Sequence, residues 1–157
     1  MTEDDLSWSE EDDAHLHYES LPDHHPSLFV DVFRTALTYD PDRSLEVLKQ
    51  AFVTPESVET WGDFSRARAI FDSGLRISMS AWYARGAPDV AYVRLVETDQ
   101  HFSPIVDEVP ASVHVTLVWR PELSADPTLS WRIHSLGNAV EPQAVPRSAL
   151  GVDPRQL

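Results

Sequence analysis

The spacing of apolar residues changes once along this chain, near Leu75, and that change restricts the possible folds more than any other feature. Before Leu75, apolar residues recur every three or four positions, as on one face of a helix. After it, they alternate with polar residues, as on a β-strand. Helices followed by antiparallel strands predict an α+β fold in which the helices cover one face of the sheet. The 157 residues suit a single domain of this kind.

Capping residues and prolines divide the first half of the chain into helical segments. Ser27 is placed to cap a first helix. Asp40-Pro41 and Thr54-Pro55 each put a capping residue before a proline, and so predict two further starts. A last helical stretch covers 63–72, and Gly74 follows it.

Four strands are predicted in the second half, at 75–84, 90–98, 112–120 and 128–137. Arg85-Gly86-Ala87-Pro88 is a good turn sequence between the first two, and a polar loop joins the two hairpins. The first hairpin allows two registers. If Ala81 pairs near Val93, Tyr83 faces the helices; a shifted pairing puts Tyr92 and Arg94 there instead.

The acidic residues are concentrated at the N-terminus. Residues 1–26 hold nine of the 26 Asp and Glu and no Lys or Arg, leaving 17 acids and 12 cations, a net charge of −5, for the rest. So charged a segment buries too little apolar area to offset its chain entropy. We therefore expect a disordered acidic tail over 1–26, a single α+β domain over 27–140, and an extended, proline-containing arm over 141–157.

Composition excludes several classes of protein. Without Cys the chain has no disulfide scaffold, thiolate zinc site or Cys nucleophile. A net charge of −14 argues against nucleic acid as a partner. No apolar run reaches the roughly 20 residues of a membrane span, and the N-terminus is the reverse of a signal peptide. The five Gly form no phosphate loop or dinucleotide motif, so we expect no cofactor. From the absence of a membrane span and of a signal peptide we expect a cytoplasmic protein with no membrane partner.

The strict alternation of strand side chains assigns the second hairpin's residues to two faces. With Leu117 opposite Trp131, the apolar set must face the helices, because burial of each such side chain contributes about 1.5–3 kcal/mol. This inner set is Val113, Val115, Leu117, Trp119, Leu129, Trp131 and Ile133, and the outer set is His114, Thr116, Val118, Arg120, Ser130, Arg132 and His134.

In this register His114 and His134 lie directly opposite each other on the outer face. We interpret them, with Thr116 and Arg132, as half-exposed residues of that face or of a homodimer interface. A pH-sensitive contact is the alternative. No carboxylate alternates beside the two histidines, which argues against a zinc site there.

The order of elements and an aromatic last strand, LSWRIHSLG, resemble the nuclear-transport-factor-2-like superfamily over about residues 27–140. The resemblance implies a cone-shaped fold with the helices on the concave face of a curved sheet, and a pocket between them. It also implies dimerisation through the outer sheet face. The superfamily includes ketosteroid isomerases, scytalone dehydratases and polyketide cyclases. Its members usually have a short strand between the second and third helices, for which only 51–53 is available here.

The candidates for lining such a pocket are Trp61, Tyr83, Trp119 and Trp131. A buried indole N–H needs a hydrogen-bond partner, which a ligand can supply. The competing interpretation is that these aromatic residues only pack the core.

Catalysis in such a pocket would need a carboxylate or a His, and the inner strand faces contain neither. Asp63 is a weak candidate, although its position also fits a helix cap. Asp72 and His101 are the other helix or loop residues that could supply the group.

The tail contains residues for two loose kinds of binding. His15, His17, His24 and His25 could hold zinc or nickel weakly, but we favour a solvated tail in which these histidines are incidental, and expect no metal site. Hydrophobic residues among the acids could dock on a basic protein partner; they are Leu6, Trp8, Leu16 and Tyr18.

Taken together, these features favour a non-catalytic domain that binds a small apolar ligand, a second copy of itself or another partner. The alternative is a small-molecule dehydratase, isomerase or cyclase that uses a carboxylate or His in its cavity.

Overall fold

The computed structural model describes most of the chain outside the tail and the loop between the two hairpins. The described residues are 6–7, 22, 24–38, 41–71, 76–98, 112–126, 129–149 and 151–156. The predicted loop at 99–110, with His101, and Asp72 therefore lie outside them, as does most of the tail, including His15 and His17.

The helical layer follows the predicted order. Its elements are α1 (Pro26–Thr38), α2 (Pro41–Val47) continued by the π-helical turn η3 (Leu48–Phe52), the 3₁₀ turn η4 (Pro55–Ser57), α3 (Val58–Trp61) and α4 (Ser65–Phe71). The capping role assigned to Ser27 is wrong. The first helix begins at Pro26, and Nδ1 of His25 accepts the N–H of Ser27, so His25 satisfies an amide that the helix leaves unpaired.

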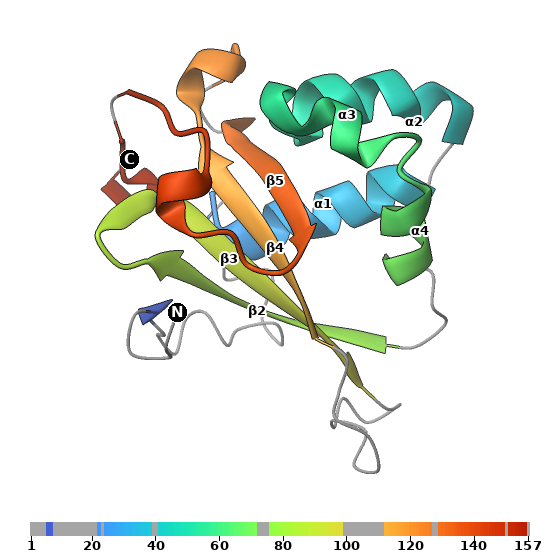
Figure 1. The fold of residues 1–157 in the computed structure, drawn as a ribbon, viewed down its shortest axis with the longest axis horizontal. Coiled ribbons are helices and arrows are strands. Elements are labelled where there is room, and N and C mark those ends of the chain that lie inside the picture. The colour runs from blue at the N-terminus through green and yellow to red at the C-terminus, as the bar shows by residue number, and fades with distance from the viewer. Residues whose placement is uncertain are drawn as a thin grey trace.

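The four main strands form a curved, open antiparallel sheet in which each strand pairs with the next in the chain (Figure 1). They are β2 (Arg76–Ala84), β3 (Ala87–Thr98), β4 (Ser112–Trp119) and β5 (Trp131–Gly137). A two-residue strand, β1 (Leu6–Ser7), pairs with the free edge of β2. The molecule is thus an α+β fold, as the change of apolar spacing predicted.

The first hairpin adopts the first of its two registers. Ala81 lies opposite Val93, so Tyr83 faces the helices, while Tyr92 belongs to the other face.

In the second hairpin the predicted register is wrong by two residues along β5. Leu117 lies opposite Ile133 instead of Trp131, and Trp119 lies opposite Trp131. The connection between the strands contains a 3₁₀ turn, η5 (Pro121–Leu123), and β5 begins only at Trp131. A shift of two residues leaves each side chain on its predicted face. Leu129, expected inside, precedes the strand and is 57% exposed.

Aromatic residues fill the interior between sheet and helices. Trp119 and Trp131 pack edge to face with ring centroids 5.1 Å apart, and both are buried. Phe33 on α1 contacts the rings of Phe52, Phe64 and Phe71. This side of the sheet is a packed core, with Tyr83 also in it.

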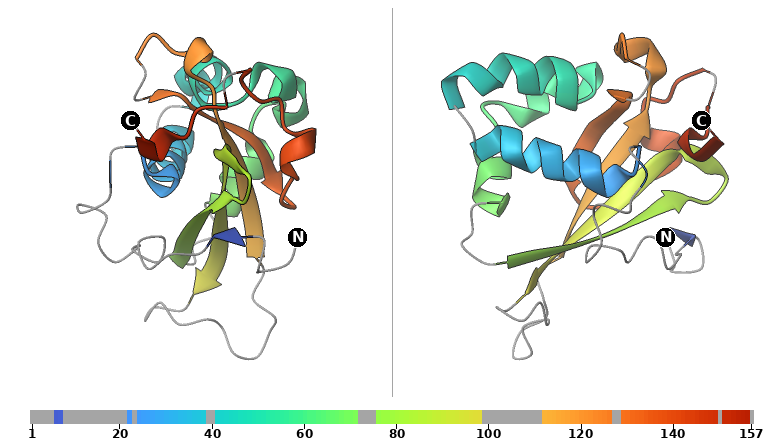
Figure 2. Two further views of the ribbon diagram at one scale, coloured as in Figure 1. Left: turned by 90° about the vertical axis from the view of Figure 1, so that its left-hand side faces the viewer. Right: turned by 180° about the vertical axis from the view of Figure 1, so that it is seen from behind.

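The segment after β5 crosses the sheet face opposite α1 (Figures 1 and 2). It includes two 3₁₀ turns, η7 (Pro142–Ala144) and η8 (Pro154–Gln156). The hydroxyl of Tyr92 donates to the carbonyl of Val140 (2.7 Å), and Arg147 forms a bidentate ion pair with the buried Asp89. A second, smaller apolar cluster results, made of Trp82, Ala84, Ala87, Val90, Tyr92, Val118 and Val145.

Candidate functional site

His134 occupies a bulge in the edge strand β5. Thr116 of β4 lies opposite Ser135, and Leu117 lies opposite Ile133, so His134 has no residue across from it. His114 lies opposite Gly137. The predicted pairing of His114 with His134 is therefore wrong, because the register of the hairpin is shifted by two residues and the extra residue at the bulge adds a third.

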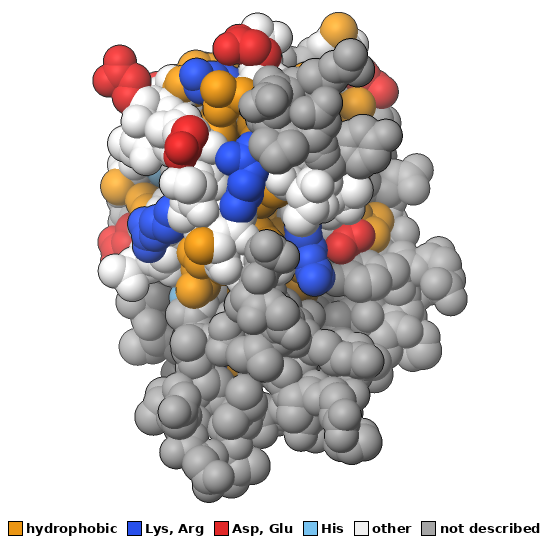
Figure 3. Space-filling view, turned by 90° about the vertical axis from the view of Figure 1, so that its right-hand side faces the viewer, with side chains coloured by type: hydrophobic (Ala, Val, Ile, Leu, Met, Phe, Trp, Pro, Cys, Tyr) orange, Lys and Arg blue, Asp and Glu red, His pale blue; other side chains and the backbone are white. Residues whose placement is uncertain are grey.

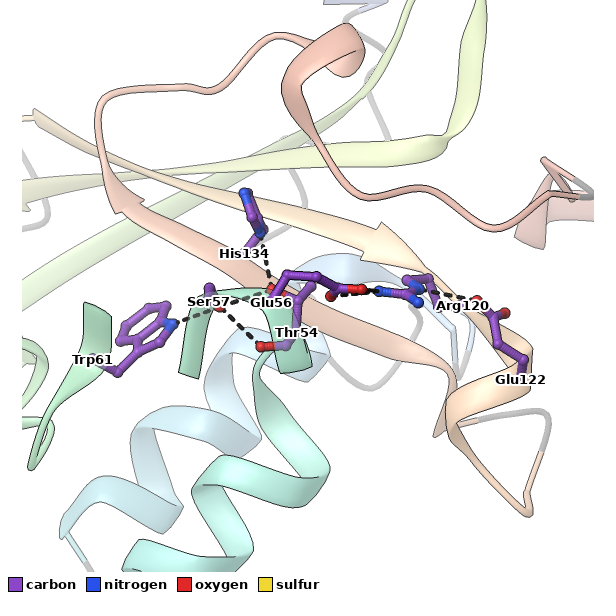
Figure 4. Close-up of polar contacts among 7 residues, drawn as sticks. All are labelled: Thr54, Glu56, Ser57, Trp61, Arg120, Glu122 and His134. Atoms are coloured by element: carbon purple, nitrogen blue, oxygen red, sulfur yellow. Dashed lines mark hydrogen bonds and ion pairs between the residues drawn. The ribbon is translucent and has the colours of Figure 1, made fainter. Parts of the chain in front are cut away.

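The chain between η3 and η4 lies along the free edge of β5 and supplies a partner for His134. Val53 forms a one-residue parallel bridge with Ile133, and the N–H of Thr54 donates to the carbonyl of Ile133 (3.0 Å). This bridge falls within 51–53, where the family resemblance required a strand. It places the Thr54 hydroxyl 2.9 Å from Nδ1 of His134 (Figure 4).

A chain of hydrogen bonds determines which ring nitrogen of His134 carries the proton. The Ser57 hydroxyl donates to the carbonyl of Thr54 (3.0 Å), so it must accept in its 2.7 Å contact with the Thr54 hydroxyl. Having donated to Ser57, Thr54 can only accept from His134. We therefore assign the proton to Nδ1, which leaves a lone pair on Nε2.

Nε2 of His134 makes no hydrogen bond with any described residue, and His134 is half-buried. Desolvation lowers the pKa of His134, while the nearby Glu56 acts to raise it and Arg120 to lower it. The ring is thus neutral at pH 7, with Nε2 able to accept a proton or a hydrogen bond.

Both carboxylate oxygens of Glu56 are bound by a cation. Arg120 donates to both carboxylate oxygens of Glu56 (2.9 and 2.7 Å) and also to Glu122 (2.9 Å) (Figure 4). Partial burial is the largest single effect and raises the pKa of Glu56, but the hydrogen bonds and charge of Arg120, with smaller contributions from a backbone hydrogen bond and His134, together hold that pKa below its ordinary value. Glu56 is therefore an ionised structural carboxylate.

Trp61 forms a wall beside this network. Its indole N–H donates to the Ser57 hydroxyl (2.9 Å), and its ring stacks on Phe64. Phe64 has φ = 62°, a left-handed conformation that is costly for a bulky residue, but its side chain is fully buried. The burial holds the turn between α3 and α4 in place, and with it the wall.

These residues enclose a cleft of about 380 Å³ between the helical turns and β5, which we call the His134 cleft. It is lined by Glu56, Ser57, Thr60, Trp61, Arg66, Ala67, His134, Ser135, Leu136 and Val140.

Two other hollows are less suited to binding a small molecule. One, of about 450 Å³, lies between the β2–β3 turn and the segment after β5, where Arg147 is already paired with Asp89. The other, of about 260 Å³, is an apolar groove between α1, η3 and the β4–β5 connection. Its Arg132 guanidinium is engaged by three backbone carbonyls and does not offer a ligand a polar anchor.

Three of the predicted pocket residues belong to the core instead of lining an interior cavity. Trp119, Trp131 and Tyr83 are buried among one another, and the Trp131 indole donates to the carbonyl of His24 (2.6 Å). Trp131 also forms part of the wall of the apolar groove. Trp61 alone of the four lines the His134 cleft.

Asp63 is exposed and accepts the N–H of Ser65 at the start of α4 (3.0 Å). Hydrogen bonds from Ser65 lower its pKa. A carboxylate in this position has the properties of a helix cap and not of a buried acid.

The predicted outer-face residues have different surroundings. Thr116 is buried and accepts the N–H of Val140 (3.0 Å), and Arg132 is only 4% exposed. His114 packs edge-on against Trp82 and is half-buried. Desolvation and Arg94 lower the pKa of His114.

Sequence reasoning missed most residues around His134. Thr54 was assigned only as a cap, but its hydroxyl turns toward Ser57 and His134. No sequence pattern links Glu56 and Ser57 of η4 to Arg66 of α4 and to Arg120 after β4, because these elements are separate in the chain. The one usable signal was the sequence Thr54-Pro55, which marks where the chain turns onto the sheet edge.

No protein-family model, curated protein or solved structure matches the chain. None of the helices in the described part of the chain is long and apolar enough to span a membrane. On the face shown in Figure 3, basic side chains lie apart from one another, among acidic and hydrophobic ones. Within the described ranges, no three His, Asp or Glu side chains come together as a metal site.

Proposed function

We propose that this chain is a non-catalytic small-ligand-binding domain with a nuclear-transport-factor-2-like fold, and that its ligand enters the His134 cleft. The fold assignment is supported by the order of helices and strands, by the curved antiparallel sheet and by the Val53 bridge between the second and third helices.

The observation that carries the proposal is the unpaired Nε2 of His134 in an open cleft. Ligand sites combine apolar walls with a few oriented polar groups. Here Trp61 and Leu136 supply apolar surface, and the bond to Thr54 orients the ring of His134. The sheet–helix interior offers no comparable space among the described residues, because Trp119, Trp131 and Phe33 are packed within it.

An acid–base enzyme of the dehydratase, isomerase or cyclase kind is the second candidate. It is favoured by the same residue, since a neutral His with one nitrogen fixed and the other free has the arrangement of a general base. A second free group that exchanges protons near neutral pH is lacking in the described part of the cleft, where both oxygens of Glu56 are bound to Arg120 and Arg66 stays protonated. We therefore place binding first.

Indole N–H resonances provide a test that distinguishes cleft from core. The Trp61 indole reports on the His134 cleft, and the Trp131 indole reports on the interior. We expect small amphipathic fragments, screened by ¹H–¹⁵N NMR, to shift Trp61 and leave Trp131 unmoved. Shifts confined to Trp131, or to neither indole, would contradict the proposal. Conversion of a bound fragment in the NMR tube would favour the enzyme.

A homodimer through the outer sheet face is a further proposal for this chain. The segment after β5 already covers Thr116 and Tyr92, so such a dimer would use the remaining area near His114 and Arg94. Light scattering at micromolar concentration tests it, and a monomeric mass would reject it.

A basic protein partner for the acidic tail is a further proposal, tested by binding of a basic peptide with and without 1 M salt.

A further inference from the structure

Arg66 gives the His134 cleft an unpaired positive charge. It lies in the first turn of α4, is exposed, and forms no ion pair or hydrogen bond with any residue in the described ranges. Its guanidinium lies against Gly137 of β5, where an added Cβ would come within 3.1 Å of Nη2. Gly137 also has φ = 148°, which disfavours any other residue. The strand is therefore bare where the guanidinium lies along it.

The cleft thus presents two polar functions of opposite kind. Arg66 is a pure hydrogen-bond donor with a positive charge, and Nε2 of His134 is an acceptor. Trp61, Leu136 and Val140 add apolar surface to the lining of the same cleft. Among the described residues, Glu56 is the one carboxylate that lines the cleft, and it is neutralised by Arg120 and does not compete for Arg66.

We propose that the ligand of this cleft is a small amphipathic hydroxy acid, with its carboxylate bound by Arg66 and its hydroxyl donating to His134. The guanidinium matches a planar carboxylate through paired N–H donors. A ligand hydroxyl supplies the proton that Nε2 lacks, and an aromatic or alicyclic body covers the apolar wall. This inference rests on the proposed function, because it names the chemical class of that function's ligand.

The net negative charge of the protein means that an anionic ligand needs a local cation in order to bind. A chain with a net charge of −14 repels anions at long range, so only a local cation can hold one. An exposed guanidinium contributes an attraction that salt screens. We therefore expect binding of a hydroxy acid to weaken as ionic strength rises, and binding of its neutral ester to be insensitive to salt.

The test uses three probes of one shape, titrated into the full chain by ¹H–¹⁵N NMR. They are 3-(4-hydroxyphenyl)propanoate, its methyl ester, and 3-phenylpropanoate, which lacks the hydroxyl. Each is titrated into the wild type, R66Q, R66K and the control R34Q, which removes a cation on α1 outside the cleft. Shifts of the Trp61 indole locate the binding.

We expect the hydroxy acid to bind most tightly, with its affinity reduced about tenfold in R66Q, less in R66K and not at all in R34Q. The ester should bind more weakly than the acid and equally to all four proteins. Loss of the hydroxyl should weaken binding several-fold through the unpaired Nε2.

Three results would overturn the inference, and they are distinguishable. If the ester and the acid bind the cleft equally and R66Q changes neither, the hydroxy-acid assignment fails while the proposed binding function stands. If no probe shifts Trp61, both fail together. Unchanged acid affinity in R66Q alongside a loss in R34Q would also reject it, since the charge would then lie elsewhere.

Discussion

At the residue scale, Thr54 connects the helical layer to the site. One hydroxyl donates to Ser57 and accepts from His134, and the residue is fully buried. Sequence alone indicated the turn at Thr54-Pro55 but not this role. A threonine hydroxyl can cap a helical turn or bridge two other side chains, and the sequence does not distinguish these roles. Here the position of β5 beside Thr54 brings His134 within hydrogen-bond distance.

Replacing Thr54 by Val keeps the shape of the side chain and removes the hydroxyl. Because Nδ1 of His134 and the Ser57 hydroxyl each lose a partner in a part-buried site, we expect T54V to lower the free energy of unfolding by about 1–3 kcal/mol. Urea denaturation measures it. T35V is the matched control, because the Thr35 hydroxyl bonds within an exposed helix turn and its loss should cost less than about 0.5 kcal/mol. Equal costs for the two variants would contradict the account.

At the scale of elements, strand alternation predicted correctly which residues of β4 and β5 face the helices, but the predicted residue-to-residue pairing of these strands is wrong. Leu117, Trp119 and Ile133 face the helices as expected. The separation of His114 from His134 follows from the two-residue shift in register together with the one extra residue in β5, for which the sequence has no distinctive signal. The segment after β5 was predicted as extended, but the ion pair that anchors it was not predicted. Asp89 and Arg147 are 58 residues apart in the chain, so no local sequence pattern links them.

Removing Arg147 tests that anchor. R147A leaves the fully buried carboxylate of Asp89 without its cation, and we expect a loss of about 3 kcal/mol in unfolding free energy. This is the lower end of the range for buried pairs, because the Arg147 side chain is 36% exposed.

Hydrogen exchange at the Val140 amide, which donates to Thr116, should accelerate in R147A if the segment is released from the sheet. R94A, which removes an exposed cation from the same sheet face, is the control and should change neither quantity. Unchanged exchange in R147A would show that Asp89 does not hold the segment.

At the scale of the whole molecule, helices before strands were enough to predict an α+β fold. The location of the site was not predictable, because expectation placed it inside the sheet and the aromatic residues there pack against one another. The cleft that we propose as the site lies where the helical turns meet the edge strand. Desolvation lowers the pKa of both His114 on β4 and His134 on β5.

This leads to a pH dependence of stability. Both histidines have folded pKa values below the ordinary 6.5, so the unfolded chain takes up protons first as the pH falls. The stability that they contribute is present above about pH 6.5 and is lost as the pH falls through their folded pKa values. Glu56 and Glu122, whose pKa values are lowered, lose theirs only in a more acidic window.

We expect the free energy of unfolding, measured in urea, to decline between about pH 7.5 and pH 5.5. The decline should be shallower in H114Q and in H134Q, and shallowest in the double variant. A wild-type profile that is flat over this range, or one that both substitutions leave unchanged, would contradict the two pKa directions.

The central claim is that His134 is neutral at pH 7, with its proton on Nδ1 and a free lone pair on Nε2 facing the cleft. Long-range ¹H–¹⁵N NMR of the ring, assigned by comparison with H134Q, tests it most directly. The account predicts a protonated-type resonance for Nδ1 and an unprotonated-type resonance for Nε2. A proton on Nε2, or two protonated nitrogens at pH 7, would contradict it.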